Sequence, residues 1–288
     1  MQYLLVVCSL VFASCCFGQP KIGLIDFYGQ RRVSPERLRK AMGIREGGAL
    51  PPSKLTLEEK LEEVDDVVRA HIEASCCYEG GAILYAGIEE RGAANFPFRL
   101  TQEEREMPAP GSQDVEGLMA AVRVAADPSI RADSAAWLGD QPPTQAIIDT
   151  LQWAAQDPDP IVRRAAVRGL VRMARAAPGG DPERKLQVLP TWIIAMLDSV
   201  IWSDRVAAVD ALLELTTNRD AVLIDKIRES GFHSLVQMAR WRHLPHALPP
   251  YLLLCRVAGL PEEEAQASWV AGDRDKVIAQ IMKENRKR

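Results

Sequence analysis

The sequence predicts a small α+β unit with a βααββ order, followed by an all-α solenoid built from pairs of helices. Alternating apolar residues and paired glycines indicate strands within residues 21–92, and one capped helical motif recurs within residues 114–288. The 288-residue chain is long enough for one large domain or two smaller ones. Its formal net charge of -4 gives no global basic surface, so we expect no nucleic-acid partner.

Residues 1–18 predict a removable signal peptide. Their continuous apolar run, residues 3–17, is too short for a comfortable membrane span, and small residues follow it, although the usual Lys or Arg before the run is missing. Residues 13–15 also resemble the end of a bacterial lipobox, with Phe12 where Leu is usual. We therefore expect an exported chain, periplasmic or secreted, and lipidation of Cys15 as a membrane tether stays open as an alternative.

The α+β unit is predicted from strand and helix signals in chain order. The signals are a strand over residues 21–29, a short helix capped by Ser34, a longer helix with the apolar face Leu57, Leu61, Val64 and Val68, and two strands over residues 72–78 and 82–89. Glycines at 80 and 81 suit a hairpin turn between the last two strands. Carboxylates at 62, 63, 65 and 66 predict a solvated outer face for the longer helix.

This order of elements resembles a POTRA domain over residues 21–92. The resemblance rests on spaced aromatics, aliphatics and glycines: Phe27-Tyr28-Gly29, Val33-Ser34, Leu38, residues 47–50 and Ile88-Glu89. It implies that the exposed sheet edge and the groove beside it receive extended segments of partner proteins, by β-augmentation. A small α+β domain that only packs against the solenoid is the alternative.

Three cysteines lie outside the leader, at Cys76, Cys77 and Cys255, and three thiols cannot all pair within one chain. Neighbours in a strand point to opposite faces, which predicts one core thiol and one exposed thiol for Cys76 and Cys77. A vicinal disulfide or a link to Cys255 stays open in an exporting compartment. The pair is unusual within a POTRA-like unit.

Residues 93–113 predict a linker or ordered loop, because prolines and a glycine stand among charged residues there. Helical pairs follow from residue 114. The helices are expected over residues 115–126, 130–138, 144–156, 160–174, 184–198, 203–216, 220–229, 233–240, 249–258, 262–270 and 273–284.

One helix, over residues 157–174, has the clearest signals of its ends. Asp159 can cap free N–H groups and Pro160 suits the first helical position. Partial copies begin at Asp127 and Ser203. A helical unit that recurs at such intervals predicts a solenoid, whose pairs bury a core only by stacking.

The copies resemble HEAT repeats, in which an Asp-Pro opening, an Arg and small residues mark the second helix of each pair. The Arg lies at 131, 163 and 205, so the intervals are 32 and 42 residues. The resemblance covers roughly the C-terminal two thirds of the chain, residues 114–288. It implies a binding scaffold more than a catalyst.

We expect these arginines to form a structural ladder with the carboxylates that open the helices. The ladder comprises Arg131, Arg163 and Arg205, with Asp127, Asp157 and Asp159 as partners in the same or the neighbouring repeat. A ladder that faces a ligand is the alternative.

Trp202 and Trp241 each border a loop beside charged residues, so we expect both to be exposed. Exposed Trp and Arg are common anchors of protein interfaces. Trp202, Arg205, Trp241 and Arg242 are therefore the candidate interface.

The strongest candidate for a reactive or metal-binding cluster in the sequence is the set of histidines His233, His243 and His246. No Cys, Asp or Glu stands at ligand spacing beside His243-x-x-His246, and Pro245 would interrupt a helix there, so we expect no metal. The chain also lacks a Gly-rich phosphate loop, a His-Glu-x-x-His pair and a Gly-x-Ser-x-Gly elbow, so we expect neither an enzyme nor a cofactor.

The sequence therefore predicts an exported, non-catalytic scaffold that binds envelope or secreted proteins through its sheet edge and its solenoid groove. The alternative is a HEAT-type enzyme, or a subunit like the cofactor lyases, with a pocket near His233, His243 and His246. Whether the three imidazoles meet in space distinguishes the two.

Overall fold

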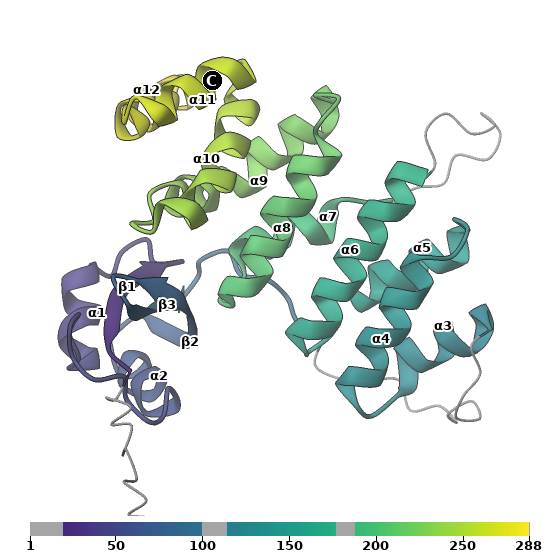
Figure 1. Ribbon diagram of the computed structural model, residues 1–288, viewed down its shortest axis with the longest axis horizontal. Helices are drawn as coiled ribbons and strands as arrows, with labels where there is room; N and C mark the ends of the chain where they lie inside the picture. Colours follow the sequence, from purple (N-terminus) through teal and green to yellow (C-terminus); the bar gives the residue numbers. More distant parts are fainter. Residues whose placement is uncertain (1–19, 100–113, 177–187, 288) are drawn as a thin grey trace, which may run out of the picture.

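The computed structural model describes residues 20–99, 114–176 and 188–287. Its three-stranded sheet lies beside a stack of helices (Figure 1). The expected leader with Cys15 and most of the expected linker lie outside the described residues. No helix in the described ranges is both long enough and apolar enough to cross a membrane.

The sheet has the predicted βααββ order. Its elements are β1 (Ile22–Tyr28), α1 (Pro35–Met42), α2 (Leu55–Glu62), β2 (Val67–Tyr78) and β3 (Gly81–Glu90). The strands lie in the order β1-β3-β2, with β3 parallel to β1 and antiparallel to β2. As expected, Ser34 caps α1: its side chain accepts a hydrogen bond from the backbone N–H of Arg37. The two outer strands, β1 and β2, are therefore the sheet edges.

The predicted second helix is too long. It ends at Glu62, and Val68 lies in β2 with 53% of its surface exposed instead of on the apolar face of a helix. The chain turns at Asp66, whose φ is 74°, and the β-branched residues after it enter the strand. Asp65 and Asp66 therefore lie in a turn and not on a helix face.

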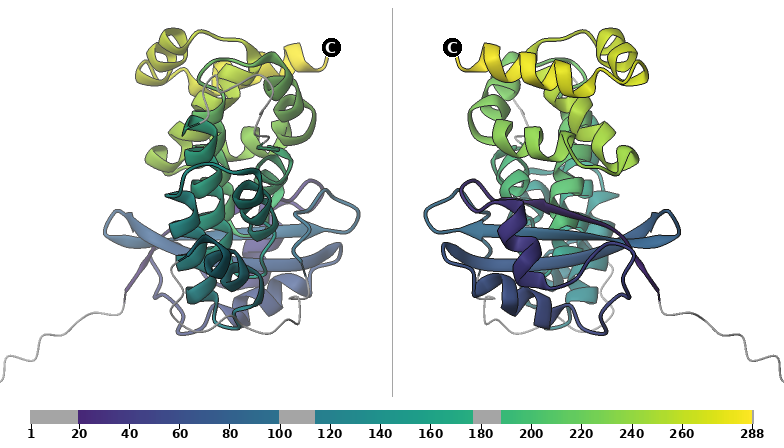
Figure 2. Two further views of the ribbon diagram at one scale, coloured as in Figure 1. Left: turned by 90° about the vertical axis from the view of Figure 1, so that its right-hand side faces the viewer. Right: turned by 90° about the vertical axis from the view of Figure 1, so that its left-hand side faces the viewer.

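The sheet is covered on both faces. One face packs on α1 and α2 through a core that includes Leu38, Leu61 and Ile72. The other face contributes Tyr28 and Tyr85 to the core of the helical stack. The strands thus lie between α1 and α2 on one side and the stack on the other, against α8 and α9 (Figures 1 and 2).

Ten α-helices of the stack lie in the described ranges after residue 113. They are α3 (Val115–Val124), α4 (Pro128–Gly139), α5 (Gln145–Ala154), α6 (Pro160–Ala176), α7 (Thr191–Ala195), α8 (Trp202–Leu215), α9 (Ala221–Ala239), α10 (Leu244–Ala258), α11 (Glu262–Val270) and α12 (Arg274–Asn285). Helices α4, α6, α8 and α10 contact one another in sequence and form one layer, called the inner helices below. They begin at 128, 160, 202 and 244, which continues the predicted intervals as 32, 42 and 42 residues.

The predicted boundaries are wrong in three regions of the stack. The two helices expected over residues 220–229 and 233–240 are the single helix α9, because Gly231 is a packing position: a Cβ there would lie 2.4 Å from Cδ1 of Leu197. Helix α10 begins at Leu244 and not at 249, because Pro245 occupies the first turn, where no amide donor is needed. Of the helix expected over residues 184–198, residues 184–187 lie outside the described residues, α7 begins only at Thr191 and ends at Ala195, and a 3₁₀ turn continues to Asp198.

Candidate functional site

The first step of the arginine ladder joins two neighbouring repeats. Arg131 of α4 donates from Nε and Nη2 to the two carboxylate oxygens of Asp157, each at 2.9 Å. Its Nη1 donates to the carbonyl of Ala125, at 2.8 Å, in the turn before its own helix. Arg131 is 3% exposed and Asp157 is fully buried, so this is a bidentate pair inside the core. Asp157 is one of the predicted partners.

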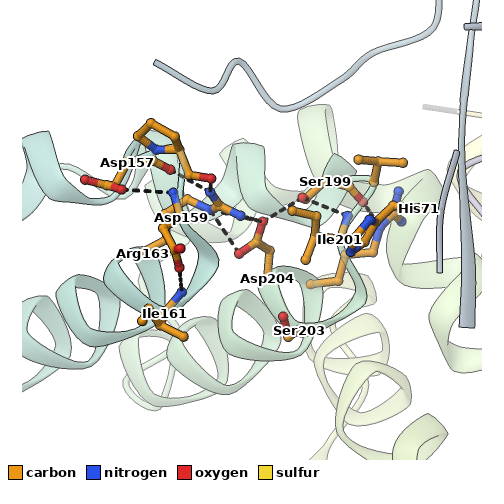
Figure 3. A network of polar contacts seen from close by, with 12 residues as sticks. His71, Asp157, Asp159, Ile161, Arg163, Ser199, Ile201, Ser203 and Asp204 are labelled. Carbon is orange, nitrogen blue, oxygen red and sulfur yellow. Dashed lines mark hydrogen bonds and ion pairs between the residues drawn. The ribbon is translucent and has the colours of Figure 1, made fainter. Parts of the chain in front are cut away.

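The second step uses a carboxylate that the sequence analysis missed. Arg163 of α6 donates to Asp204 of α8, with 2.7 Å between Nη2 and Oδ2 and 3.0 Å between Nε and Oδ1 (Figure 3). The hydroxyl of Ser199 donates to the same carboxylate at 2.8 Å. Burial raises the pKa of Asp204, and Arg163 opposes that shift. Ser199 stands 42 residues after Asp157, at the equivalent position of the next repeat. In the first step the residue at this position is itself the carboxylate, whereas in the second step it is a serine whose hydroxyl binds the carboxylate of Asp204.

Asp127 and Asp159 are helix caps. Oδ1 of Asp127 accepts the backbone N–H of Ser129 at 2.8 Å, and Oδ1 of Asp159 accepts that of Ile161 at 2.9 Å. The predicted capping role of Asp159 is confirmed. The arginines of the first two steps pair with Asp157 and Asp204 instead, because those carboxylates lie in the repeat that follows each arginine.

The third step ends on the sheet. Arg205 of α8 donates from Nε to the carbonyl of Ser199, and its guanidinium carbon lies 4.6 Å from the ring centre of Tyr28 in β1. The hydroxyl of Tyr28 donates to the carbonyl of Val200 at 2.8 Å. The position 42 residues after Ser199 is Trp241, which offers no carboxylate. The ring of Tyr28 therefore packs on Arg205 as the ring of Phe98 packs on Arg163, at the same distance of 4.6 Å, but among the described residues no carboxylate forms an ion pair with Arg205.

Aromatic rings hold the sheet against the inner helices at a cluster called the aromatic junction below, formed by Tyr28, Tyr85, Trp202, Trp241 and His246. Tyr85 stacks on Trp202, with ring centres 4.7 Å apart and planes 8° apart, and lies 5.0 Å from Trp241. Trp241 is 3% exposed, so the predicted exposure of this residue is wrong, while Trp202 is half-buried. The physical reason is that Tyr28 and Tyr85 cover the indoles that the helices alone would expose.

Arg242 fastens the edge of β1. Its backbone N–H and its Nε donate to the carboxylate of Asp26, at 2.9 and 3.0 Å, and its Nη2 donates to the carbonyl of Ile25 at 2.7 Å. It also forms an ion pair with Glu46, which accepts the backbone N–H of Ile25 at 3.0 Å. All four residues of the candidate interface, Trp202, Arg205, Trp241 and Arg242, thus contact the chain's own sheet.

Side chains also occupy part of the other edge of the sheet. Glu62 accepts the backbone N–H of Ala70 at 2.9 Å, and Glu58 accepts that of Ile72 at 2.6 Å. Both carboxylates come from α2, so this helix blocks the first half of the β2 edge. The far half, residues 74–77, is largely exposed.

Strand β2 caps helix α8 across the junction. Glu73 accepts the backbone N–H of Ser203 at 2.7 Å and its hydroxyl at 3.0 Å. The residue at the N-cap position, Ile201, has no side chain that can do this. Burial raises the pKa of Glu73, but hydrogen bonds from His71 and Ser203 outweigh it and hold that pKa below its ordinary value. The sheet therefore supplies the cap that the helix lacks.

Two of the three candidate histidines meet. The rings of His243 and His246 have centres 4.2 Å apart, and Nδ1 of His246 lies 2.7 Å from the hydroxyl of Tyr85. Burial, with a smaller contribution from His243, lowers the pKa of His246 to about 4. His233 lies on α9, where its electrostatic neighbours are Arg31, Asp198 and Arg205. Across residues 20–99, 114–176 and 188–287, no group of three or more His, Cys, Asp or Glu side chains could hold a metal ion.

The inner helices carry two adjoining hollows. The α6–α8 groove encloses about 530 Å³ and the α8–α10 pocket about 200 Å³, and the two share Val206 and Asp210. The groove is lined by Arg164, Val167, Arg168, Val171, Arg172, Arg175, Trp202, Ser203, Val206, Ala207, Asp210, Ala211 and Glu214. The pocket is lined by Val206, Val209, Asp210, Met238, Trp241, Pro245, His246, Pro249 and Pro250. These hollows are the candidate binding site, and among their residues only Trp202, Trp241 and His246 were candidate functional residues in the sequence analysis.

The cysteines outside the leader form one disulfide. Cys76 and Cys77 are joined to each other and both are exposed, so the predicted pair of one core and one exposed thiol is wrong and the vicinal alternative holds. Cys255 is free and buried, and burial raises its pKa to about 11.

Residues 115–193 match the family model of HEAT repeats, a stretch that runs from the start of α3 into α7. No match is found among curated proteins or among solved structures. The paired helices and the arginine ladder continue past the matched residues to α8. The match and the helical stack together support a HEAT-repeat protein.

Proposed function

We propose that this chain is an exported, non-catalytic scaffold that holds a partner protein in the α6–α8 groove and the adjoining α8–α10 pocket. HEAT stacks form extended binding surfaces of this kind. The observation that carries the proposal is the pair of adjoining hollows on the inner helices, with an apolar floor that includes Val167 and Val206 and a rim of charges. His246 is bound to Tyr85 and is neutral near pH 7, which favours a packing role over acid–base chemistry.

The N-terminal unit is, in this proposal, POTRA-like, and its main role is to hold the inner helices in place. The βααββ order and the strand order β1-β3-β2 support the resemblance. Side chains from α2 and Arg242 cover much of both edges. An extended partner segment would therefore add only along residues 74–77 of β2.

Photo-crosslinking tests the groove. We would place benzoylphenylalanine at Glu214, on the rim of the groove. The matched control is Val222 of α9, which is 65% exposed and lines neither hollow. The proposal predicts discrete protein adducts at position 214 that disappear when Val206→Trp fills the floor, and none at position 222. Adducts at both positions, or adducts that survive Val206→Trp, would contradict it.

Export is tested separately by the intact mass of the protein purified from its own cells. We expect a chain that begins near Gln19, or at Cys15 with the added mass of a lipid, found with envelope or secreted proteins. An uncleaved chain in the cytoplasm would reject export without touching the groove proposal.

A further inference from the structure

We infer that the partner segment is acidic and carries one apolar anchor: its carboxylates bind Arg164 and Arg168 on α6, and the anchor enters the α8–α10 pocket. This inference rests on the proposed function and adds the chemistry of the partner. The contrast in charge motivates it. The whole chain carries a formal charge of -4, whereas the groove is lined by four arginines against two carboxylates.

Two of the four groove arginines are already engaged. Arg172 donates to the carbonyl of Gly139 at 3.2 Å and forms an ion pair with Asp140 at the same distance. Arg175 forms an ion pair with Glu214 across the groove. Arg172 is thus held toward α4, and of these pairs only that of Arg175 with Glu214 joins α6 to α8, near the C-terminus of α6.

The other two arginines are the available cations. Arg164 and Arg168 lie one helical turn apart, and neither has an ion pair with any residue that the structure describes. The Nε of Arg164 is enclosed and has no hydrogen-bond partner there. Guanidinium groups bind carboxylates through paired N–H donors, so two acidic residues one turn apart on a helix, or two apart on a strand, match their spacing.

The α8–α10 pocket suits an apolar side chain. Its walls include Met238, Trp241 and Pro249, and its volume of about 200 Å³ accepts one large aliphatic or aromatic group. Val206 forms part of both the groove floor and the pocket wall. One segment can therefore contact α6 with its charges and fill the pocket with its anchor.

Asp210 sets the orientation of the segment. It borders both hollows and its side chain is exposed. Its negative charge repels acidic residues from the α8 side, so the acidic face of the segment lies along α6. A flat anionic membrane would meet Asp210 and Glu214 together with the arginines, which favours a protein segment over a lipid surface.

Selection from a random library of displayed 16-residue peptides on the purified chain tests the inference, followed by fluorescence anisotropy of labelled synthetic peptides. We expect the enriched peptides to share Asp or Glu residues beside a large apolar residue. Arg164→Glu with Arg168→Glu should weaken binding by at least about tenfold, and Asp210→Asn should strengthen it by about twofold to fivefold. Lys40→Glu with Lys60→Glu, on the exposed faces of α1 and α2, is the matched control and should leave affinity unchanged. Circular dichroism and melting confirm that each variant folds.

The outcomes separate the inference from the proposed function. One outcome is that the enriched peptides are neutral or basic, that Val206→Trp abolishes their binding, and that the arginine reversals leave it unchanged. This would overturn the acidic partner while leaving the groove as the binding site. Peptides that ignore Val206→Trp would overturn both. The last experiment measures binding to vesicles that contain 30% phosphatidylglycerol. Vesicle binding that requires Arg164 and Arg168 would overturn the inference of a protein segment in favour of a membrane surface.

Discussion

The buried arginine of the third step of the ladder has a different partner from the arginines of the first two steps. Arg131 and Arg163 each bind a carboxylate of the next repeat, whereas Arg205 packs on Tyr28 of the sheet. Each guanidinium also donates to a carbonyl in the turn before its own helix. At the third step the following repeat has Trp241 at the position equivalent to Asp157 and Ser199. The difference teaches that the sheet, and not the following repeat, contacts the arginine there.

Removing the carboxylate of the second step should have the largest effect. Asp204→Ala leaves the fully buried guanidinium of Arg163 without its counter-charge, so the free energy of unfolding should fall by about 3–5 kcal/mol. Urea unfolding followed by circular dichroism measures it. The double variant Arg163→Met with Asp204→Leu removes both charges and should lose less than the single variant. A larger loss in the double variant would mean that the pair is net stabilising beyond its burial.

Changing the ring of the third step should have a smaller effect. Tyr28→Leu removes the stacking on Arg205 and the hydrogen bond to Val200, so we expect a loss of about 2–3 kcal/mol in the same assay. Tyr28→Phe keeps the ring and loses only the hydroxyl, so it should lose about 1 kcal/mol. Equal losses in the two variants would show that the hydrogen bond, and not the contact of the ring with Arg205, stabilises this step.

Helix caps outside the ladder should matter less. Asp159→Ala removes the bond to the N–H of Ile161 and should lower the free energy of unfolding by about 1 kcal/mol, and Asp127→Ala should do the same. A loss as large as that of Asp204→Ala would place these carboxylates in the ladder after all, as the sequence had predicted.

A further expected effect is a dependence of the free energy of unfolding on pH at the aromatic junction. Because the pKa of His246 is lowered to about 4 in the folded chain, the unfolded chain binds a proton first as the pH falls. The contribution of the neutral His246 to the free energy of unfolding is therefore fully present above about pH 6.5 and is lost as the pH falls from that value to about pH 4. His246→Gln should flatten this part of the stability curve. If the wild type and the variant lose stability in parallel over this range, His246 is not the cause.

Sequence reasoning predicted the repeat helices and the arginines because both depend on local signals, such as the Asp-Pro opening before Arg163. It missed Asp204 because the position equivalent to Asp204 in the preceding repeat, 42 residues earlier, is the apolar Val162, so the repeat pattern gave no sign of an acid there. At the position equivalent to Asp157, where an acid was expected, the repeat of α8 has Ser199. Only the folded turn brings Ser199 and Asp204 together.

The same reasoning selected Trp202, Arg205, Trp241 and Arg242 as an interface and did not identify what they contact. Their partners lie in the sheet, more than 100 residues earlier in the chain, and no periodicity predicts which face of a sheet docks on which helix. Gly87 marks the docking site only after the fact, since a Cβ there would lie 1.9 Å from the carbonyl oxygen of Val200.

Native-state hydrogen exchange on the full chain, comparing wild type with Tyr28→Leu, tests most directly whether the sheet serves as the partner of the third step. If it does, the opening free energies of amides in α8 and β1 should fall together in the variant, while those in α4 stay unchanged. The contradicting result is a fall confined to β1 with α8 unaffected, which would mean that the sheet only rests on a stack that is complete without it.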